Sequence, residues 1–201
     1  MVNVGFYWRM FTKPKEELPL AVQNATFGKG VKIYFVIGAA IGLLLAVILS
    51  LVAGLVAAFS PQVAQLAGVA GIAIFLVAPI VMGLFVVALS LLSMGISFVI
   101  AKIFGGTGSF GQMYCLFAVV AVPMLVINLL VSLIPFVGSL LSLLLGLYYL
   151  YLGVLIYEVV FGFSTLKAVL LYVVLPFLVG ILLAFLVIGS VFSVATPMLG
   201  R

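Results

Sequence analysis

The chain contains a long stretch without any ionisable side chain. No Lys, Arg, Asp or Glu occurs between Tyr34 and Ala101. Across the 201 residues, 68% are hydrophobic and 5% are charged, whereas about 25% of the residues in a soluble domain are charged. So few charged side chains could not cover a soluble fold, and several apolar runs exceed the ~18 residues that mark a transmembrane helix. The sequence therefore predicts an all-α fold, a polytopic transmembrane helix bundle.

The apolar runs divide the chain into a short N-terminal segment, residues 1–33, and a transmembrane domain, residues 34–201. The predicted spans are approximately residues 34–59, 68–103, 114–134, 137–160 and 168–194. The second run is too long for one upright helix, because some 35 residues would extend roughly 50 Å across a hydrocarbon core of ~30 Å. We expect one tilted or bent helix with a kink at Pro79. A sixth span or a re-entrant piece within residues 68–103 stays open as the alternative.

The basic residues predict the orientation of the bundle. Five of them precede the first span, Lys102 lies between the second and third spans, and Lys167 lies between the fourth and fifth. With five spans all of these fall on one side, so the positive-inside rule places the N-terminus in the cytoplasm and the C-terminus outside. A sixth span would move Lys102 and Lys167 outside, so the charges favour five. Orientation also explains the net charge of +5, and we expect no nucleic-acid partner.

A glycine-rich loop follows the second predicted span. Residues 106–111, GTGSFG, match the G-x-G-x-x-G pattern of dinucleotide-binding proteins. That pattern needs a preceding strand and an acid about 20 residues later, but no acid lies between Glu17 and Glu158. We interpret the loop as a tight cytoplasmic turn that faces Glu158 and residues 164–167, with glycine where φ is positive or backbones approach closely. Its glycines are Gly105, Gly106, Gly108 and Gly111.

Three segments carry a resemblance to a known family. They are FYWRMFTKPKEEL at residues 6–18, GGTGSFGQ with the later VPML of the third span, and YYLYLGVLIYEVVFGFSTLKAVLLYVVLP at residues 148–176. They resemble the Ypt-interacting-protein (YIP) family of five-span membrane proteins, over nearly the whole chain. The resemblance implies the five-span fold and a non-enzymatic membrane role. We interpret that role as a scaffold or adaptor in membrane organisation or a trafficking-like process.

The chain also departs from the eukaryotic members of that family. They have a long cytoplasmic N-terminal region and a Tyr-Gly-containing sequence, whereas this N-terminal segment is short and lacks those sequences. The chain therefore resembles a short prokaryotic-type member, a multi-pass protein of the cell membrane. The Rab-type GTPase partners of eukaryotic members are not carried over.

Glu158 is the only acid outside the N-terminal segment. It lies just inside the cytoplasmic end of the fourth predicted span. An acid within the membrane is costly, so it is a functional candidate by default. We favour a structural ion pair over binding of a proton or cation, because the predicted depth is shallow. The candidate partners, all predicted on the same side, are Lys32, Lys102 and Lys167.

Other residues suggest contacts between helices. Asn128 lies in the outer half of the third span, where its amide could hydrogen-bond a neighbouring helix for about 1 kcal/mol. We favour that role over a substrate contact. Small residues at helical spacing permit close approach of helices in the same chain or in another copy. They are Gly38 and Gly42 in the first span, and Gly146 and Gly153 in the fourth.

The remaining composition bears on function. The chain has no His, no Asp and a single Cys, which excludes metal sites built from His or Cys and leaves a serine nucleophile without its usual base. We therefore expect no enzyme activity and no cofactor. The predicted partners are the lipid bilayer, with anionic headgroups at Lys29 and Lys32 of a surface-lying N-terminal segment, and a second copy or another membrane protein. Few polar residues lie at depth, which favours a scaffold over the alternative, a small transporter or channel working as an oligomer.

Overall fold

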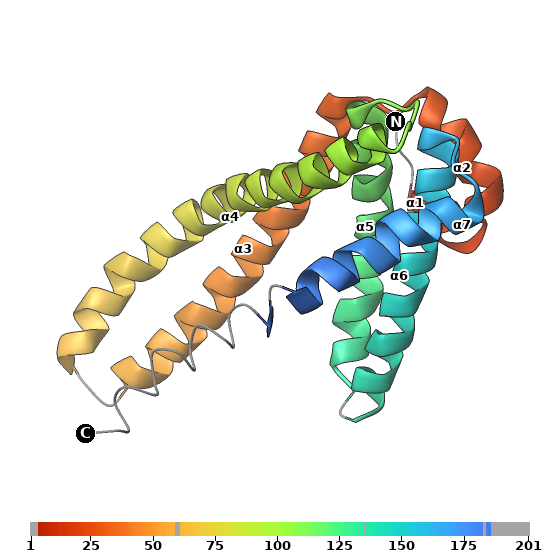
Figure 1. Cartoon of the computed structure of the whole chain (residues 1–201). Helices are drawn as coiled ribbons and strands as arrows, with labels where there is room; N and C mark the ends of the chain where they lie inside the picture. The colour runs from red at the N-terminus through yellow and green to blue at the C-terminus, as the bar shows by residue number, and fades with distance from the viewer. Residues whose placement is uncertain (1–3, 59–60, 135, 183, 186–201) are drawn as a thin grey trace, which may run out of the picture.

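In the computed structural model, which describes residues 4–58, 61–134, 136–182 and 184–185, the chain is a helical bundle (Figure 1). Two short helices come first, α1 (Val4–Thr12) and α2 (Pro14–Gln23). The long helices are α3 (Phe27–Ala57), α4 (Pro61–Ile103), α5 (Phe110–Ser132) and α6 (Val137–Phe161). The last described span begins with α7 (Thr165–Val169) and continues through a π-helical turn, η1 (Leu170–Val174), to Leu182. Five helices of the described chain are therefore long and apolar enough to cross a membrane.

The predicted five-span, all-α fold is confirmed, with differences at the span boundaries. The first span begins at Phe27, about seven residues earlier than expected, because α3 continues through Lys29 and Lys32. The second is one uninterrupted helix of 43 residues with Pro79 inside it, so the alternative of a sixth span there is wrong. Its span begins at Ala73. The expected end of the fifth span, near residue 194, lies outside the described residues.

The long helices form two hairpins. Figure 1 shows α3 beside a curved α4, and α5 beside α6, with the two pairs diverging away from the end that carries α1 and α2. Glycines on α3 bring the first pair together. A Cβ added at Gly38 would lie 2.5 Å from the Met82 carbonyl oxygen, and one added at Gly42 would lie 2.5 Å from that of Ala78. These two glycines therefore allow the close backbone approach of α3 and α4 that small residues permit.

The two glycines of α6 behave differently from each other. Gly153 lies against the ring of Tyr172 in η1, which occupies the space that a Cβ would take. Tyr172 also packs on Phe117 and Tyr157, with ring centroids 5.5 and 5.2 Å away. At Gly146, by contrast, no atom lies within 4 Å of the position of a Cβ. The packing expected from Gly146 is therefore not made within the described chain.

The most buried residues gather where the N-terminal helices meet α5 and α6. Met10 and Leu18, one from each short helix, have side chains that are 0% exposed. The Phe11 ring packs edge-on against Tyr148 of α6, at 4.9 Å between centroids, and the Tyr148 hydroxyl donates a hydrogen bond to the Phe11 carbonyl. α1 and α2 are therefore packed into the bundle and complete its core. That this segment also lies at the membrane surface stays a prediction.

Candidate functional site

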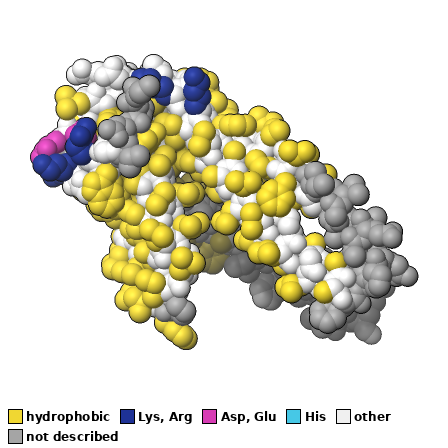
Figure 2. Space-filling view, turned by 180° about the vertical axis from the view of Figure 1, so that it is seen from behind, with side chains coloured by type: hydrophobic (Ala, Val, Ile, Leu, Met, Phe, Trp, Pro, Cys, Tyr) yellow, Lys and Arg dark blue, Asp and Glu magenta, His cyan; other side chains and the backbone are white. Residues whose placement is uncertain are grey.

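The charged side chains of the described residues gather at one end of the bundle. This end, here called the charged end, consists of α1, α2, the start of α3, the loop of residues 104–109 and the turn of residues 162–164. Figure 2 shows its Lys, Arg and Glu side chains in one region, while hydrophobic side chains cover much of the rest of that face. The only ion pairs among the described residues join Arg9 to Glu17 at 2.8 Å and Lys13 to Glu16 at 3.8 Å.

The loop of residues 104–109 is bound to the end of α6 rather than open for a ligand. The backbone N–H and the hydroxyl of Thr107 both donate to the carbonyl oxygen of Phe161, at 3.3 and 3.2 Å. Helix α6 ends at Phe161 and is followed by Gly162, whose φ of 70° is left-handed, so the last carbonyls of α6 need partners from outside the helix. Thr107 supplies one of them, and the loop thereby caps α6.

The glycines of the loop have packing roles that the sequence pattern alone does not reveal. Gly105 has a φ of 82° and reverses the chain after α4. A Cβ at Gly106 would lie 2.7 Å from the Phe161 ring, one at Gly108 would lie 2.8 Å from the Val160 carbonyl carbon, and one at Gly111 would lie 3.1 Å from the Phe27 nitrogen. The G-x-G-x-x-G spacing therefore places the loop backbone tightly against α6 and the start of α3, which accounts for these glycines without a nucleotide.

Two lysines tie this loop to its surroundings. The Lys102 ammonium donates to the carbonyl of Thr107 at 3.3 Å, and the Lys167 ammonium donates to the carbonyl of Phe104 at 2.6 Å. Each also lies over a phenylalanine ring, Phe98 for Lys102 and Phe163 for Lys167. Lys102 and Lys167 thus both bind the loop, and Lys167 links the α4–α5 connection to α7.

Glu158 belongs to a cavity that this loop does not line. It is half-buried and lines a cavity of about 280 Å³ between α2, α6 and α7. The remaining lining residues are Lys15, Tyr151, Val154, Leu155, Thr165 and Val169. Among the described residues no ion pair joins Glu158 to a basic side chain. The expected pairing with Lys32, Lys102 or Lys167 is therefore wrong, and the basic residue that shares the cavity is Lys15, which α2 carries to α6.

Two pairs of polar side chains deeper in the bundle are hydrogen-bonded between helices. The Ser142 hydroxyl of α6 donates to the side-chain oxygen of Asn128 on α5 at 2.9 Å, and both also line an open cavity of about 320 Å³. On another helix pair, the hydroxyls of Ser90 on α4 and Tyr114 on α5 share a hydrogen bond at 2.7 Å. Asn128 thus makes a contact between helices, as its position in the sequence suggested.

Some contacts at the charged end were not expected. Ser109 and Gln112 form a capping box at the start of α5, in which the Ser109 hydroxyl accepts from the Gln112 N–H at 3.3 Å and the Gln112 side chain accepts from the Ser109 N–H at 3.1 Å. The S-x-x-Q sequence pattern is a known signal for this cap. The bond from Tyr148 to Phe11 has no comparable signal, because it joins segments far apart in the sequence.

Comparison with known proteins agrees with this architecture. The family model of the Yip1 domain matches residues 8–188, which covers the second half of α1, all of α2, the glycine loop and the five membrane-spanning helices. No curated protein and no solved structure shows significant similarity to the chain. Because the match covers far more than half of the chain, and because the five-span helical fold agrees with it, the chain belongs to the Yip1 domain family of multi-pass membrane proteins.

Proposed function

We propose that this protein is a non-enzymatic membrane scaffold or adaptor that meets its partner through the charged end. In this proposal the charged end lies in the cytoplasm of a prokaryotic-type cell, in keeping with the positive-inside rule. The observation that carries the proposal is that four separate pieces of the chain are held together there. They are α1, α2, the loop of residues 104–109 and the α6–α7 turn.

Holding these pieces together favours binding of a protein partner. A surface that is already ordered loses little conformational entropy when it binds, so more of its contact energy appears as affinity. Large apolar side chains also remain exposed at this end, namely Trp8 at 56%, Leu20 at 61% and Leu166 at 73%. Tryptophan is enriched among the residues that dominate binding interfaces. We therefore expect Trp8 to be a main contact, with Glu158 and Lys15 as polar contacts beside it.

The deeper polar groups argue against a transport pathway. Transporters and channels use polar or ionisable groups inside the membrane to bind and pass their cargo. Here Asn128 is bonded to Ser142, and Ser90 to Tyr114, on different pairs of helices. Groups that satisfy each other in this way leave few free positions for an ion or a solute. The alternative of an oligomeric transporter rests on the Glu158 cavity alone.

A site-specific crosslinking experiment tests the proposed surface. A photo-crosslinking amino acid is placed in the cell at Trp8, and at Leu84, an equally exposed residue (59%) on the membrane-spanning part of α4, as the matched control. We expect a discrete protein adduct from position 8 and none from position 84. The captured protein is then purified, and its Kd is measured for the wild type, Trp8→Ala and Leu84→Ala. We expect Trp8→Ala to weaken binding at least tenfold, which is the size of effect seen for dominant interface residues.

A flux assay separates the scaffold from the transporter. The wild type and Glu158→Gln are reconstituted into liposomes, and uptake of protons, monovalent cations and small solutes is measured. The scaffold proposal expects no saturable uptake by either protein. Saturable uptake by the wild type that Glu158→Gln abolishes would replace the scaffold with the transporter alternative.

A further inference from the structure

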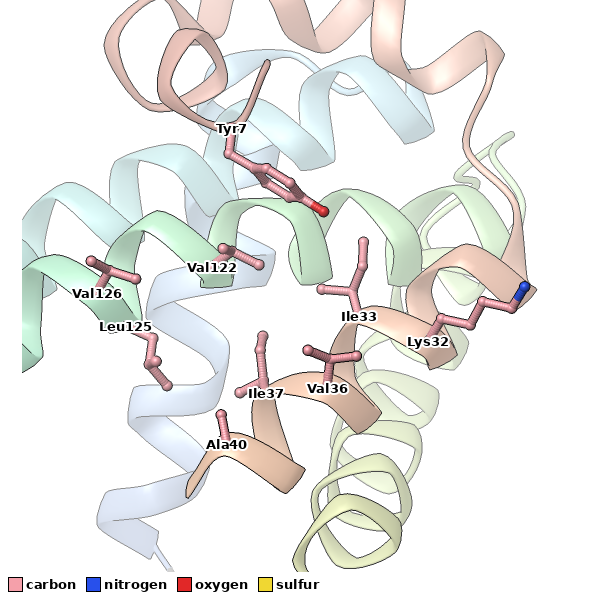
Figure 3. Close-up of a pocket in the computed structure, with 9 residues that line it drawn as sticks. All are labelled: Tyr7, Lys32, Ile33, Val36, Ile37, Ala40, Val122, Leu125 and Val126. Atoms are coloured by element: carbon pink, nitrogen blue, oxygen red, sulfur yellow. The ribbon is translucent and has the colours of Figure 1, made fainter. Parts of the chain in front are cut away.

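A groove of about 440 Å³ lies between α1, α3 and α5 (Figure 3). This volume is within the range of about 300–1,000 Å³ found for small-molecule sites. Its walls come from one face of α3, at the helical spacing of Ile33, Val36, Ile37 and Ala40, and from the stretch of α5 between Val122 and Val126. Val36 is 64% exposed and Val126 is 50% exposed, so the groove opens sideways toward the lipid.

The groove exists because α3 and α5 are in close contact near their N-terminal ends and diverge beyond that contact. Gly30 of α3 lies so close to α5 that an added Cβ would be 2.6 Å from the Tyr114 ring and 3.1 Å from the Cys115 backbone. One turn further on, the rings of Tyr34 and Tyr114 are in contact, with centroids 5.0 Å apart. Beyond this point the two helices diverge (Figure 1), and the space between them becomes the groove.

The groove has an apolar interior and a polar mouth. Tyr7 reaches over it from α1, and Lys32 stands at its rim with the ammonium directed away from the apolar walls (Figure 3). Burial raises the pKa of Tyr7 above its ordinary value, so the hydroxyl keeps its proton and can donate a hydrogen bond. From Ile33 to Ala40 the apolar wall extends about 10 Å along α3, which fits within one leaflet of a ~30 Å hydrocarbon core.

The charges around the mouth favour an anion. Lys32 takes part in no ion pair among the described residues, because the acids Glu16 and Glu17 are paired with other basic residues of α1 and its connection to α2. Lys29, one turn earlier on α3, donates to the Asn24 carbonyl at 2.8 Å and does not line the groove. Lysines at this depth attract anionic lipids. A hydrocarbon chain with an anionic headgroup therefore matches both parts of the groove.

We infer that this groove binds one anionic phospholipid of the leaflet at the charged end. One acyl chain lies between α3 and α5, and the phosphate lies at Lys32 and Tyr7. The lipid also fills the gap where the two hairpins diverge, so it stabilises their relative position. This site shares α1 with the proposed partner surface, through Tyr7 beside Trp8, but its test uses only lipid and does not depend on that partner.

Native mass spectrometry tests the site with two lipids that differ only in the headgroup. The detergent-solubilised full chain is mixed with equimolar dioleoyl phosphatidylglycerol and dioleoyl phosphatidylcholine, and the retained adducts are counted. We expect one phosphatidylglycerol to be retained in preference to phosphatidylcholine. Lys32→Gln should lower this preference about fivefold, from the known contribution of one lysine to binding of anionic lipid. Lys29→Gln, with the same loss of charge, should change it less than twofold.

A second pair of variants tests whether the groove holds the acyl chain. Ala40→Phe fills the groove and should reduce retention of both lipids at least fivefold, whereas Ala88→Phe, on an exposed face of α4 outside the groove, should not. Both variants must elute as single peaks with wild-type melting temperatures. Equal effects of Lys32→Gln and Lys29→Gln would overturn the site in favour of general surface charge. Unchanged lipid retention in Ala40→Phe would refute the groove as the lipid site. A lipid-free dimer of the wild type that Ala40→Phe dissociates would also refute it, because a second copy of the chain would then occupy the groove.

Discussion

Replacing Gly108 with alanine tests whether the glycine loop is a packing device. A Cβ at this position would lie 2.8 Å from the Val160 carbonyl carbon and closer still to its oxygen, whereas ordinary contact begins at 3.4 Å. The opposing atoms belong to the backbone of α6, which cannot turn aside as a flexible side chain would. The loop must therefore move away from α6, and the two hydrogen bonds from Thr107 to the Phe161 carbonyl are lost.

The expected loss of stability follows from these contacts. Overpacking of a tight contact costs about 1–3 kcal/mol. The two hydrogen bonds share one acceptor, so their loss adds about 1 kcal/mol rather than twice that. The free energy of unfolding should therefore fall by about 2–4 kcal/mol. For a chain of this size 1 kcal/mol corresponds to about 2–4 °C, so the melting temperature should fall by about 5–15 °C.

The assay measures the melting temperature in detergent micelles, from the fraction of protein that stays monodisperse after heating. Substitutions of two other glycines serve as controls. Gly105→Ala meets no atom within 4 Å but keeps a φ of 82°, and an alanine there costs only about 1–2 kcal/mol. Gly95→Ala, in α4 with nothing within 4 Å, should leave stability unchanged or raise it, since alanine favours helix. A melting temperature for Gly108→Ala equal to that of Gly95→Ala would refute the packing argument. A nucleotide that stabilises the wild type but not Gly108→Ala would restore the phosphate-binding interpretation.

Three further predictions concern contacts between helices. Gly42→Ala should destabilise the bundle by about 1–3 kcal/mol through its clash with α4, whereas Gly54→Ala, with nothing within 4 Å, should not, and equal melting temperatures would contradict this. A double-mutant cycle of Asn128→Leu and Ser142→Ala, read by chemical unfolding in micelles, should give a coupling energy of about 0.6 kcal/mol, and additive effects would contradict the bond. Tyr148→Phe should raise the rate of limited proteolysis of α1 about fivefold, for a lost hydrogen bond of ~1 kcal/mol, and an unchanged rate would show that this bond does not hold α1 in place.

The positions of the spans were predictable because of the solvent in which they fold. Inside lipid each segment must satisfy its own backbone hydrogen bonds, so a long apolar run can only be a helix. The start of α3 was missed because Lys29 and Lys32 resemble a solvent-exposed segment, although a helix does not end where hydropathy falls. A signal for the packing of α1 and α2 was present, since the buried residues Met10, Pro14 and Leu18 recur every four residues. Such spacing indicates a buried face.

The candidate site was predictable only in its composition. The positive-inside rule predicted that the lysines lie on one side of the bundle. In the described residues, Lys102 and Lys167 do contact the glycine loop. The partner of Glu158 was mistaken, because Lys102 and Lys167 bind loop carbonyls instead. Lys15 reaches the Glu158 cavity only through the folding of α2 onto α6, a contact between segments separated by most of the chain.

By itself the sequence determined that this chain is a five-span membrane protein with its charges at one end. Hydropathy and the need to satisfy backbone groups act within each segment, so they can be evaluated without knowing the neighbours. Only the tertiary structure decided what the residues touch, such as Gly108 on α6, Tyr148 on α1 and the groove between α3 and α5. These contacts depend on how the helices cross and rotate against one another. In a membrane this arrangement is set by close packing at a few small residues, because the surrounding lipid is as apolar as the helices and hydrophobicity does not drive their association.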